Sequence, residues 1–392
     1  MTSPDSPHPH CIIIGAGITG GALACAGAQR GVQVDLVDKG NFETPPPEDG
    51  KSFALSPSSK KLFEEIGLWE TLTEITSITT IHTSDGMSNL GLDYEEADLD
   101  QGPLGYVVDS ALLKTKLMER LHAYPNIRLH GNTAITSIER NEHRVSVQTE
   151  QGDTLEAPLC IASDGRFSQT RARANIPLRE WNYNQTAIVC TLAHSLPHQN
   201  QAWEHFLPAG PLAFVPREGN VSGLVWSLET PKAAHLLKLS PEEFVEDVRR
   251  AFGPALGDLT LASERWSYPL GVCLPKRVID RRLVLVGDAA HTFHPVAGQG
   301  LNVGLRDVAA LAQTLGEAAS LGLDLGASYL LEKYQRQRQL DVLSMTYGTD
   351  GLVRVFSTQS PLMARVRSFG FGLVRNIPPL KRLMIRHARG TV

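Results

Sequence analysis

The feature that most constrains the fold of this chain is an uncharged, glycine-rich stretch close to its start. It covers residues 11–28 and reads "CIIIGAGITGGALACAGA". Its length would suit a membrane-spanning helix, but each of its five glycines costs a helix about 1 kcal/mol relative to alanine. A short buried strand over 11–14, a turn and a helix over 18–30 fit better, and a second strand follows in "GVQVDLVDKG". The stretch therefore predicts a βαβ unit.

The glycines of this unit are spaced as in a dinucleotide-binding turn. Gly15 allows a tight turn, Gly17 lets the main chain approach a pyrophosphate, and Gly20 allows the helix to pack closely on the strand. Ile18 and Thr19 begin the helix, whose first N–H groups would face the phosphates. The pattern predicts a bound dinucleotide, and a glycine-rich packing turn without a ligand is the alternative.

An acidic residue ends the second strand of the unit. Asp38 lies 18 residues beyond Gly20, where a carboxylate accepts a hydrogen bond from the adenosine ribose, and Lys39 follows it. A carboxylate at this position disfavours the 2′-phosphate of NADP. The bound nucleotide is therefore predicted to be FAD or NAD.

A second motif follows a buried strand in the middle of the chain, where the sequence reads "LCIASDGRFSQTR". Asp164 and Gly165 come directly after the apolar run, and Arg171 is a candidate to bring a guanidinium to phosphate groups. The alternative is a turn that ends the strand and leaves its arginines in solvent.

A third motif, in residues 286–315, reads "VGDAAHTFHPVAGQGLNVGLRDVAALAQTL". Asp288 ends another apolar strand and is placed to bind a sugar-like hydroxyl, and Gly298 and Gly300 form a turn that enters a helix. FAD needs such a second anchor because its ribityl chain and isoalloxazine extend beyond the adenosine half, whereas NAD held on one βαβ unit does not explain it. N–H groups at the start of this helix would stabilise negative charge on a flavin ring.

Between residues 181 and 266 the pattern changes to strands linked by Pro/Gly turns, among them "QTAIVCTLAH" and "NVSGLVWSLE". This region predicts an antiparallel sheet domain inserted into the nucleotide-binding fold. The expected division is an FAD-binding domain over 1–75, 106–180 and 267–340, a substrate domain over 76–105 and 181–266, and a helical basic tail over 341–392.

The charge of the chain is unevenly distributed. Its net charge is −5, but residues 351–392 carry eight Lys or Arg and no Asp or Glu. Two interpretations of this tail are a helical layer packed on the FAD-binding domain and a surface that meets an anionic membrane or a partner protein. The chain has no nucleic-acid motif, no metal-ligand pattern, no basic secretory leader and five cysteines without CxxC spacing, which indicates a cytoplasmic protein.

Three segments together resemble the aromatic flavoprotein monooxygenases: "GAGITG", "SDGRFSQTR" and "GDAAHTFHPVAGQGLNVGLRD". Three more, "FALSPSSKKLFEEIGLW", "GPLAFVP" and "FGLVRNIPPLKRLMIRHARG", are similar to the FAD-dependent hydroxylases of ubiquinone biosynthesis. The resemblance implies an α/β fold with a Rossmann-like FAD-binding domain, an inserted antiparallel β-sheet substrate domain and a C-terminal helical segment. It also implies hydroxylation of a lipophilic prenylated phenol, expected to be 2-polyprenyl-6-methoxyphenol, with O2 as co-substrate and NAD(P)H as electron donor.

The resemblance also implies roles for single residues. Lys51 stands where the family usually has arginine, which leaves a point charge near FAD. His294 lies beside the flavin motif and is the candidate catalytic residue. The expected FAD contacts are the pyrophosphate at Gly15, Gly17 and Gly20, the adenosine ribose at Asp38, the pyrophosphate region and NAD(P)H at Asp164, the ribityl chain at Asp288, the ring at Pro295, and its pyrimidine edge at the backbone of Leu301 and Asn302.

Three alternatives are open at this point: hydroxylation at another ring position, hydroxylation of a soluble aromatic acid, and a non-catalytic FAD-bound subunit of a lipid-synthesis assembly. A soluble acid would need arginines in the pocket, and Arg217 is the main candidate in the sheet region. A lipophilic substrate would place the protein at the surface of the inner membrane or in a ubiquinone-biosynthesis complex, contacted through the tail. A homo-oligomer is also compatible with the sequence.

Overall fold

The structure, a computed structural model, describes residues 9–86, 91–98, 102–358 and 361–390 of the chain. Its centre is a six-stranded sheet in the order β19-β20-β12-β1-β2-β8, in which every pair is parallel except β19 with β20. This is the predicted Rossmann-like arrangement, with the glycine-rich turn at the carboxyl end of the central strand β1. The strands are β1 (His10–Ile14), β2 (Gln33–Val37), β8 (Ile127–His130), β12 (Leu159–Ala162), β19 (Ile279–Asp280) and β20 (Leu283–Leu285).

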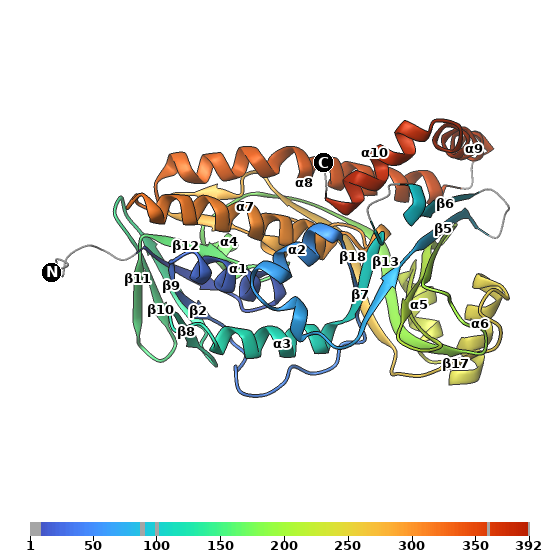
Figure 1. Cartoon of the computed structure of the whole chain (residues 1–392), viewed down its shortest axis with the longest axis horizontal. Helices are drawn as coiled ribbons and strands as arrows, with labels where there is room; N and C mark the ends of the chain where they lie inside the picture. The colour runs from blue at the N-terminus through green and yellow to red at the C-terminus, as the bar shows by residue number, and fades with distance from the viewer. Residues whose placement is uncertain (1–8, 87–90, 99–101, 359–360, 391–392) are drawn as a thin grey trace.

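The side chains of β1 explain why this sheet is covered on both faces. Successive side chains of a strand point to opposite faces, so Ile13 packs in one core while Ile12 and Ile14 pack in another. A layer of helices covers the first face and a three-stranded sheet covers the second (Figure 1). These elements are α1 (Ile18–Gln29), α3 (Ser110–His122), α7 (Gly300–Ser320), α8 (Ser328–Ser357), β9 (Ile135–Arg140), β10 (Val145–Thr149) and β11 (Thr154–Ala157).

A second large sheet has eight strands in the order β17-β13-β16-β15-β14-β5-β6, with β18 paired along β13. Its pairs are antiparallel, as predicted, except that β14 and β5 run parallel. The exception arises because β5 comes from an early segment and joins the edge of a meander that forms much later in the chain. The strands are β5 (Thr80–Asp85), β6 (Gly91–Glu95), β13 (Leu178–His194), β14 (Gln201–Leu207), β15 (Gly210–Arg217), β16 (Val221–Glu229), β17 (Leu259–Leu261) and β18 (Trp266–Pro275).

Two helices, α5 (Thr230–Leu236) and α6 (Pro241–Phe252), cover one face of this second sheet (Figure 1). The core between the helices and the sheet combines aliphatic and aromatic side chains, and the ring centroids of Phe214 and Phe252 lie 4.1 Å apart. Helix α6 begins at a capping box in which Ser240 bonds a main-chain N–H of the first turn and a glutamate of that turn bonds back.

A small connecting sheet in the order β3-β7-β4 joins the two large sheets, and helix α2 follows β3. The side chain of Asn302, at the start of α7, fixes this connection because its oxygen accepts hydrogen bonds from the Ser56 N–H and the Ser59 hydroxyl. The elements are β3 (Ser52–Leu55), α2 (Pro57–Glu65), β4 (Ile75–Ile78) and β7 (Gly105–Asp109), with short 3₁₀ turns η1 (Trp69–Thr71) and η2 (Glu96–Asp98).

The C-terminal segment consists of α8, α9 (Pro361–Asn376) and α10 (Pro378–Arg389), which run along the top of both large sheets in Figure 1. The domain boundary predicted at 340/341 falls inside α8, and the one predicted at 266/267 falls at the start of β18. Within the described parts of the chain, no helix is long and apolar enough to cross a membrane.

Candidate active site

The turn between β1 and α1 is shaped so that only glycine fits at two of its three motif positions. Gly15 has a φ of 100°, and a methyl group there would overlap the carbonyl oxygen of Ser163; one at Gly20 would overlap the carbonyl oxygen of Gly15. At Gly17 a methyl group would meet nothing within 4 Å, and no side chain caps the helix that starts there. The open side of Gly17 and the N–H groups of α1 therefore fit a pyrophosphate.

The carboxylate of Asp38 ties the end of β2 to this turn. One oxygen accepts the Ala16 N–H at 2.6 Å and the other accepts the Gly40 N–H at 2.7 Å. Each carboxylate oxygen has a second acceptor site, so a ribose hydroxyl can still bind. Lys39 beside it is exposed.

The second motif forms a loop that caps a short helix, α4 (Gln169–Arg173). Asp164 accepts hydrogen bonds from the Ser168 hydroxyl and from the N–H and hydroxyl of Thr170, and Gly165 has a φ of 81°. The carboxylate thus shapes the loop that lies next to the first glycine turn.

The two arginines of this motif have different partners in the protein. Arg171 is 4% exposed, and its guanidinium donates to the carbonyl oxygens of Ala289 and Arg166 at 2.8 Å each. It therefore joins two loops, and its direct contact with phosphates stays a prediction. Arg166 instead extends towards β18, where it donates to the carbonyl oxygen of Pro269.

The third motif meets the first through small residues. Gly287, with a φ of 58°, opens the turn η3 (Gly287–Ala289), and a methyl group there would come within 3 Å of the Thr19 side chain. Gly304 on α7 packs against the same threonine. The glycine turn of β1 and the loop after β20 are thereby held in contact.

Asp288 is the acid at the centre of this arrangement. It is exposed to solvent although protein surrounds it on most sides, and we call the position that it shares with Lys51 and Arg166 the recess. Enclosure raises the pKa of its carboxyl group, and the charges of His291, Lys51 and Arg166 oppose that shift. Three loops that are distant in sequence therefore bring a carboxylate and two cations to one recess.

Lys51 takes its position from the segment before β3. Its ammonium lies 4.0 Å from the centroid of the Tyr268 ring, and the Tyr268 hydroxyl donates to the carbonyl oxygen of Asp49. Burial lowers the pKa of Lys51, while Asp49 and Asp288 act against that shift. The lysine is thus a fixed point charge beside Asp288.

The start of α7 presents main-chain donors next to the recess. Gly298 has a φ of 60° and ends the turn η4 (Val296–Gly298) that follows Pro295. The first bond within α7 runs from the Val303 N–H to the Gln299 carbonyl, so the N–H groups of residues 300–302, which include Gly300 and Leu301, point out of the helix end. Such a helix start stabilises negative charge.

A buried carboxylate behind the recess connects the elements that form it. Asp307 on α7 is 1% exposed and accepts hydrogen bonds from His291 at 2.6 Å, Arg338 of α8 at 2.6 Å and the Gly287 N–H at 3.0 Å. Burial alone would raise the pKa of Asp307, but His291 and Arg338 hold it below its usual value. The Nε2 of His291 therefore points towards Asp307 and not towards the recess, and the histidine supports the loop.

His294, the candidate catalytic residue, is 1% exposed and lies beside the ring of Tyr183. Gln185 donates through its nitrogen to the Ala209 carbonyl, so its oxygen faces the Nε2 of His294 at 3.1 Å and that Nε2 carries the hydrogen. The Nδ1 is then a buried acceptor without a partner among the described residues. Burial lowers the pKa of His294 to about 4, which keeps the ring neutral at pH 7.

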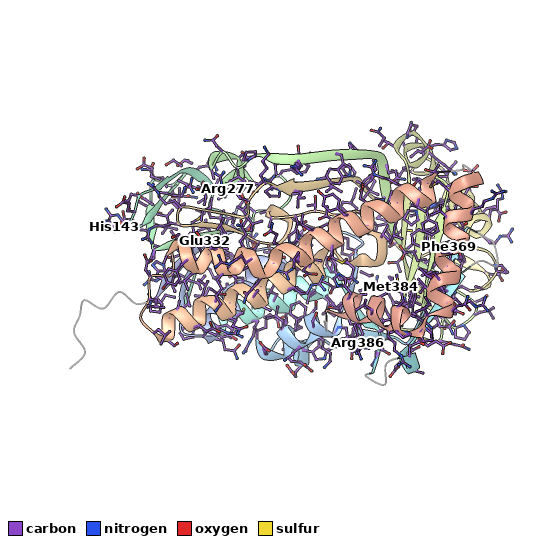
Figure 2. The ribbon with its side chains drawn as sticks, turned by 90° about the horizontal axis from the view of Figure 1, so that it is seen from above. His143, Arg277, Glu332, Phe369, Met384 and Arg386 are labelled. Carbon is purple, nitrogen blue, oxygen red and sulfur yellow. The ribbon has the colours of Figure 1, made fainter. Side chains whose placement is uncertain are left out.

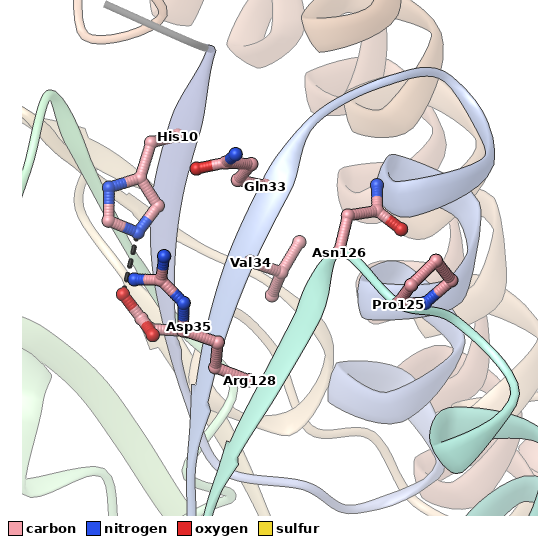
Figure 3. Close-up of a pocket in the computed structure, with 7 residues that line it drawn as sticks. All are labelled: His10, Gln33, Val34, Asp35, Pro125, Asn126 and Arg128. Carbon is pink, nitrogen blue, oxygen red and sulfur yellow. Dashed lines mark hydrogen bonds and ion pairs between the residues drawn. The ribbon is translucent and has the colours of Figure 1, made fainter.

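Two cavities are lined by residues that lie outside the three motifs. One of about 50 Å³ lies at the amino ends of β1 and β2, where His10 bonds the buried Asp35 (Figure 3). His130 bonds the same carboxylate, and although burial opposes it, the two histidines hold the pKa of Asp35 well below its usual range. This volume suits a water molecule or two and not a nucleotide.

The other cavity, of about 510 Å³, lies between the segment before Lys51 and the second large sheet. Its walls carry several carboxylates, and its one arginine, Arg217, donates to Asp109 and Thr191 at 3.0 Å each. The charge of Arg217 is therefore already offset by a protein carboxylate.

Comparison with known proteins agrees with this geometry. A family model described as FAD binding domain matches residues 9–346. Ubiquinone hydroxylase UbiL from Rhodospirillum rubrum is 44% identical over 384 residues, which cover 97% of this chain and 89% of UbiL. The 3-demethoxyubiquinol 3-hydroxylase of Escherichia coli is 30% identical over 96% of this chain and 97% of its own length. The structure of PqsL, a probable FAD-dependent monooxygenase from Pseudomonas aeruginosa, shares the fold, with a TM-score of 0.80 at 22% identity over 93% of this chain and 99% of PqsL.

The fold and the three converging motifs define an FAD-dependent monooxygenase of the aromatic-hydroxylase type. Because the family model covers most of the chain and UbiL is 44% identical over nearly its whole length, this chain belongs to the FAD-dependent hydroxylases of ubiquinone biosynthesis. The predicted fold, enzyme class and use of FAD are thus confirmed.

We predict that two glycine-to-alanine changes in the first turn affect different properties, one the stability of the protein and the other its affinity for FAD. Gly20→Ala should destabilise the flavin-free protein by at least about 2 kcal/mol, because the methyl group has no space. Gly17→Ala should change that stability by less than about 1 kcal/mol but weaken FAD binding by at least about 10-fold, because its methyl group occupies the phosphate side. Urea unfolding and FAD titration of the apoprotein measure the two effects. Equal FAD affinity of Gly17→Ala and the parent would contradict this account of the turn.

We also predict an acid-dependent loss of stability that involves His294. Its pKa is 6.5 in an unfolded chain and about 4 in the folded protein, so the unfolded form binds the proton first and stability falls between those values. Between pH 7 and pH 5 the free energy of unfolding, measured with urea, should fall by about 2 kcal/mol more for the parent than for His294→Gln. The matched control is His143→Gln at an exposed position. An identical pH dependence of His294→Gln and the parent would contradict the burial of a neutral ring.

Proposed function

We propose that this chain hydroxylates the aromatic ring of a prenylated phenol and converts 2-polyprenyl-6-methoxyphenol to the corresponding benzoquinol. O2 is the second substrate and NAD(P)H is the electron donor. The family relation supports ring hydroxylation. The choice of an apolar substrate rests on one structural observation. An apolar cluster adjoins Pro295, the residue expected to line the flavin ring.

This cluster is built from three parts of the chain. Phe206 of β14, Val296 of η4 and Val353 of α8 are buried together, and Tyr183 and Phe356 pack against them. The rings of Phe206 and Phe356 stack with centroids 4.1 Å apart. Apolar groups of this kind beside the flavin ring favour an uncharged aromatic ring with a hydrocarbon substituent over an aromatic acid.

In this proposal the first turn and Asp38 bind the adenosine half of FAD, Asp164 lies at the pyrophosphate, and Asp288 binds the ribityl hydroxyls. Lys51 and Arg166 offset the charge at the recess. Bound FAD, once reduced, supplies the activated oxygen atom, and the residues of the chain orient the reactants and exclude water.

His294 has a positioning role in this proposal. Its neutral Nδ1 is a buried acceptor beside the apolar cluster, so it is suited to accept a hydrogen bond from the phenol hydroxyl. The Nε2 of His294 donates a hydrogen bond to the side-chain oxygen of Gln185. This bond selects the tautomer in which Nδ1 carries no hydrogen.

The soluble-acid alternative receives no support from Arg217. An aromatic carboxylate needs an arginine whose charge is available, whereas Arg217 is paired with Asp109 at 3.0 Å in a cavity lined by further carboxylates. An acidic wall would repel such a substrate.

The test uses the FAD-bound protein, NADH or NADPH, isotopically labelled dioxygen and detergent-dispersed 2-prenyl-6-methoxyphenol with a short side chain. We expect a benzoquinol that contains one labelled oxygen atom, formed together with NAD(P)H oxidation. Substrate-dependent NAD(P)H oxidation without labelled product, a label at another ring position, or turnover of a soluble aromatic acid in its place would each contradict the proposal.

A further inference from the structure

The last two helices carry large apolar side chains on the side that faces away from the rest of the chain. Val366, Phe369 and Leu373 recur along α9 at helical spacing and share one face, and Leu383 and Met384 lie on α10. Phe369 is 72% exposed, Leu383 55% and Met384 41%. We call these five residues the α9–α10 face, and Figure 2 looks onto it, with Phe369 and Met384 labelled.

The opposite sides of the same helices already pack on the protein. Phe371 of α9 and Ile385 of α10 are buried. Arg367 of α9 pairs with Asp85 of β5 at 2.8 Å, which fixes the helix against the second large sheet. The outward apolar residues are therefore not needed for this packing. Large apolar groups that gather on the exposed side of a helix in this way indicate an interaction surface.

The charged side chains that the two helices themselves carry have one sign, and Asp85 and Asp98 of neighbouring elements pair with Arg367 and Lys381. Arg365, Arg375 and Arg382 are exposed on the two helices. Residues 361–390 include no aspartate or glutamate, whereas residues 1–350 contain all 42 acidic residues of the chain. The surface thus combines exposed hydrocarbon with exposed cations.

We propose that the α9–α10 face docks on a lipid bilayer that contains anionic lipids. Anionic headgroups complement the arginines, and the apolar side chains enter the boundary between headgroups and acyl chains. A second copy of the chain fits less well, because a two-fold contact through this face would bring arginines towards arginines.

The proposal deepens the proposed function, on which its purpose rests, because a prenylated phenol is dissolved in lipid. The helices that carry the face also border the predicted substrate region. Phe371 of α9 lies against Phe356, with ring centroids 5.7 Å apart, and Phe356 stacks on Phe206 beside Val296. Docking through this face therefore brings the apolar cluster close to the membrane surface.

The test is co-sedimentation of the full-length, FAD-bound protein with vesicles of phosphatidylcholine alone and of phosphatidylcholine with phosphatidylglycerol, at low and high salt. We expect binding only to the anionic vesicles and a decrease at high salt. Phe369→Ser with Leu383→Ser should weaken partitioning at least about 10-fold. Arg365→Gln with Arg375→Gln and Arg382→Gln should weaken it about 100-fold, because each cation contributes a factor of about five.

Each variant has a matched control elsewhere on the surface. Leu321→Ser with Leu196→Ser removes apolar groups that are 72% and 50% exposed. The control for the cations is the triple change Arg250→Gln, Arg277→Gln and Arg336→Gln. Retained flavin absorbance shows that each protein is folded.

Three results would overturn the proposal: no binding of the parent to anionic vesicles, equal losses in the control variants, or a parent dimer that Phe369→Ser with Leu383→Ser dissociates. Because vesicle binding requires no turnover, its failure together with hydroxylation of the detergent-dispersed phenol would reject the docking surface alone. Binding without hydroxylation would reject the proposed function alone.

Discussion

The nucleotide site depends on close contacts between main-chain segments at Gly15 and Gly20, where there is no room for a side chain. The turn after β1 approaches the chain after β12 at Gly15, and the first turn of α1 approaches Gly15 at Gly20. Because both contacts involve main-chain atoms, which cannot move aside as a flexible side chain can, the start of α1 has one position. That position sets Thr19 against Gly287, so the first and third motifs meet only because the first turn is closed.

A buried charge network extends this constraint to the rest of the molecule. Asp307 bonds the Gly287 loop, His291 and Arg338, so one carboxylate fixes a loop, α7 and α8 relative to one another. Removing one partner of such a buried network typically costs about 3–5 kcal/mol, because the remaining charges lose their compensation. Since α8 continues unbroken to Ser357, the network also sets where the helix meets the apolar cluster beside Val296.

The sequence was sufficient to predict the parts of this site that depend on local geometry. A glycine with positive φ, an acid at the end of a strand and a helix start are properties of a few neighbouring residues, so Gly15, Asp38 and the start of α7 lie where the pattern predicts them. The parallel pairing of β5 with β14 depends on residues more than a hundred positions apart, and no local pattern indicates it.

The same limit applies to charged side chains. The sequence does not distinguish the roles of Arg166 and Arg171, which both follow Asp164. Only the fold shows that Arg171 is buried between two loops while Arg166 lies near Asp288. In the tail, Arg367 and Lys381 pair with Asp85 and Asp98, so they face inward, which the basic composition of the tail does not indicate. Residues that are distant in the sequence therefore decide which cations of such a helix face outward.

We propose that FAD binds where Asp288, Lys51 and Arg166 meet. The most direct test is titration of the flavin-free protein with FAD, comparing the parent with Asp288→Ala and with Asp153→Ala, which removes an exposed acid in a distant hairpin. Loss of a hydrogen bond to a charged group costs about 1.5–3 kcal/mol, so Asp288→Ala should bind FAD about 10- to 150-fold more weakly while Asp153→Ala binds like the parent. An Asp288→Ala protein with the FAD affinity of the parent would show that the recess is not the flavin site.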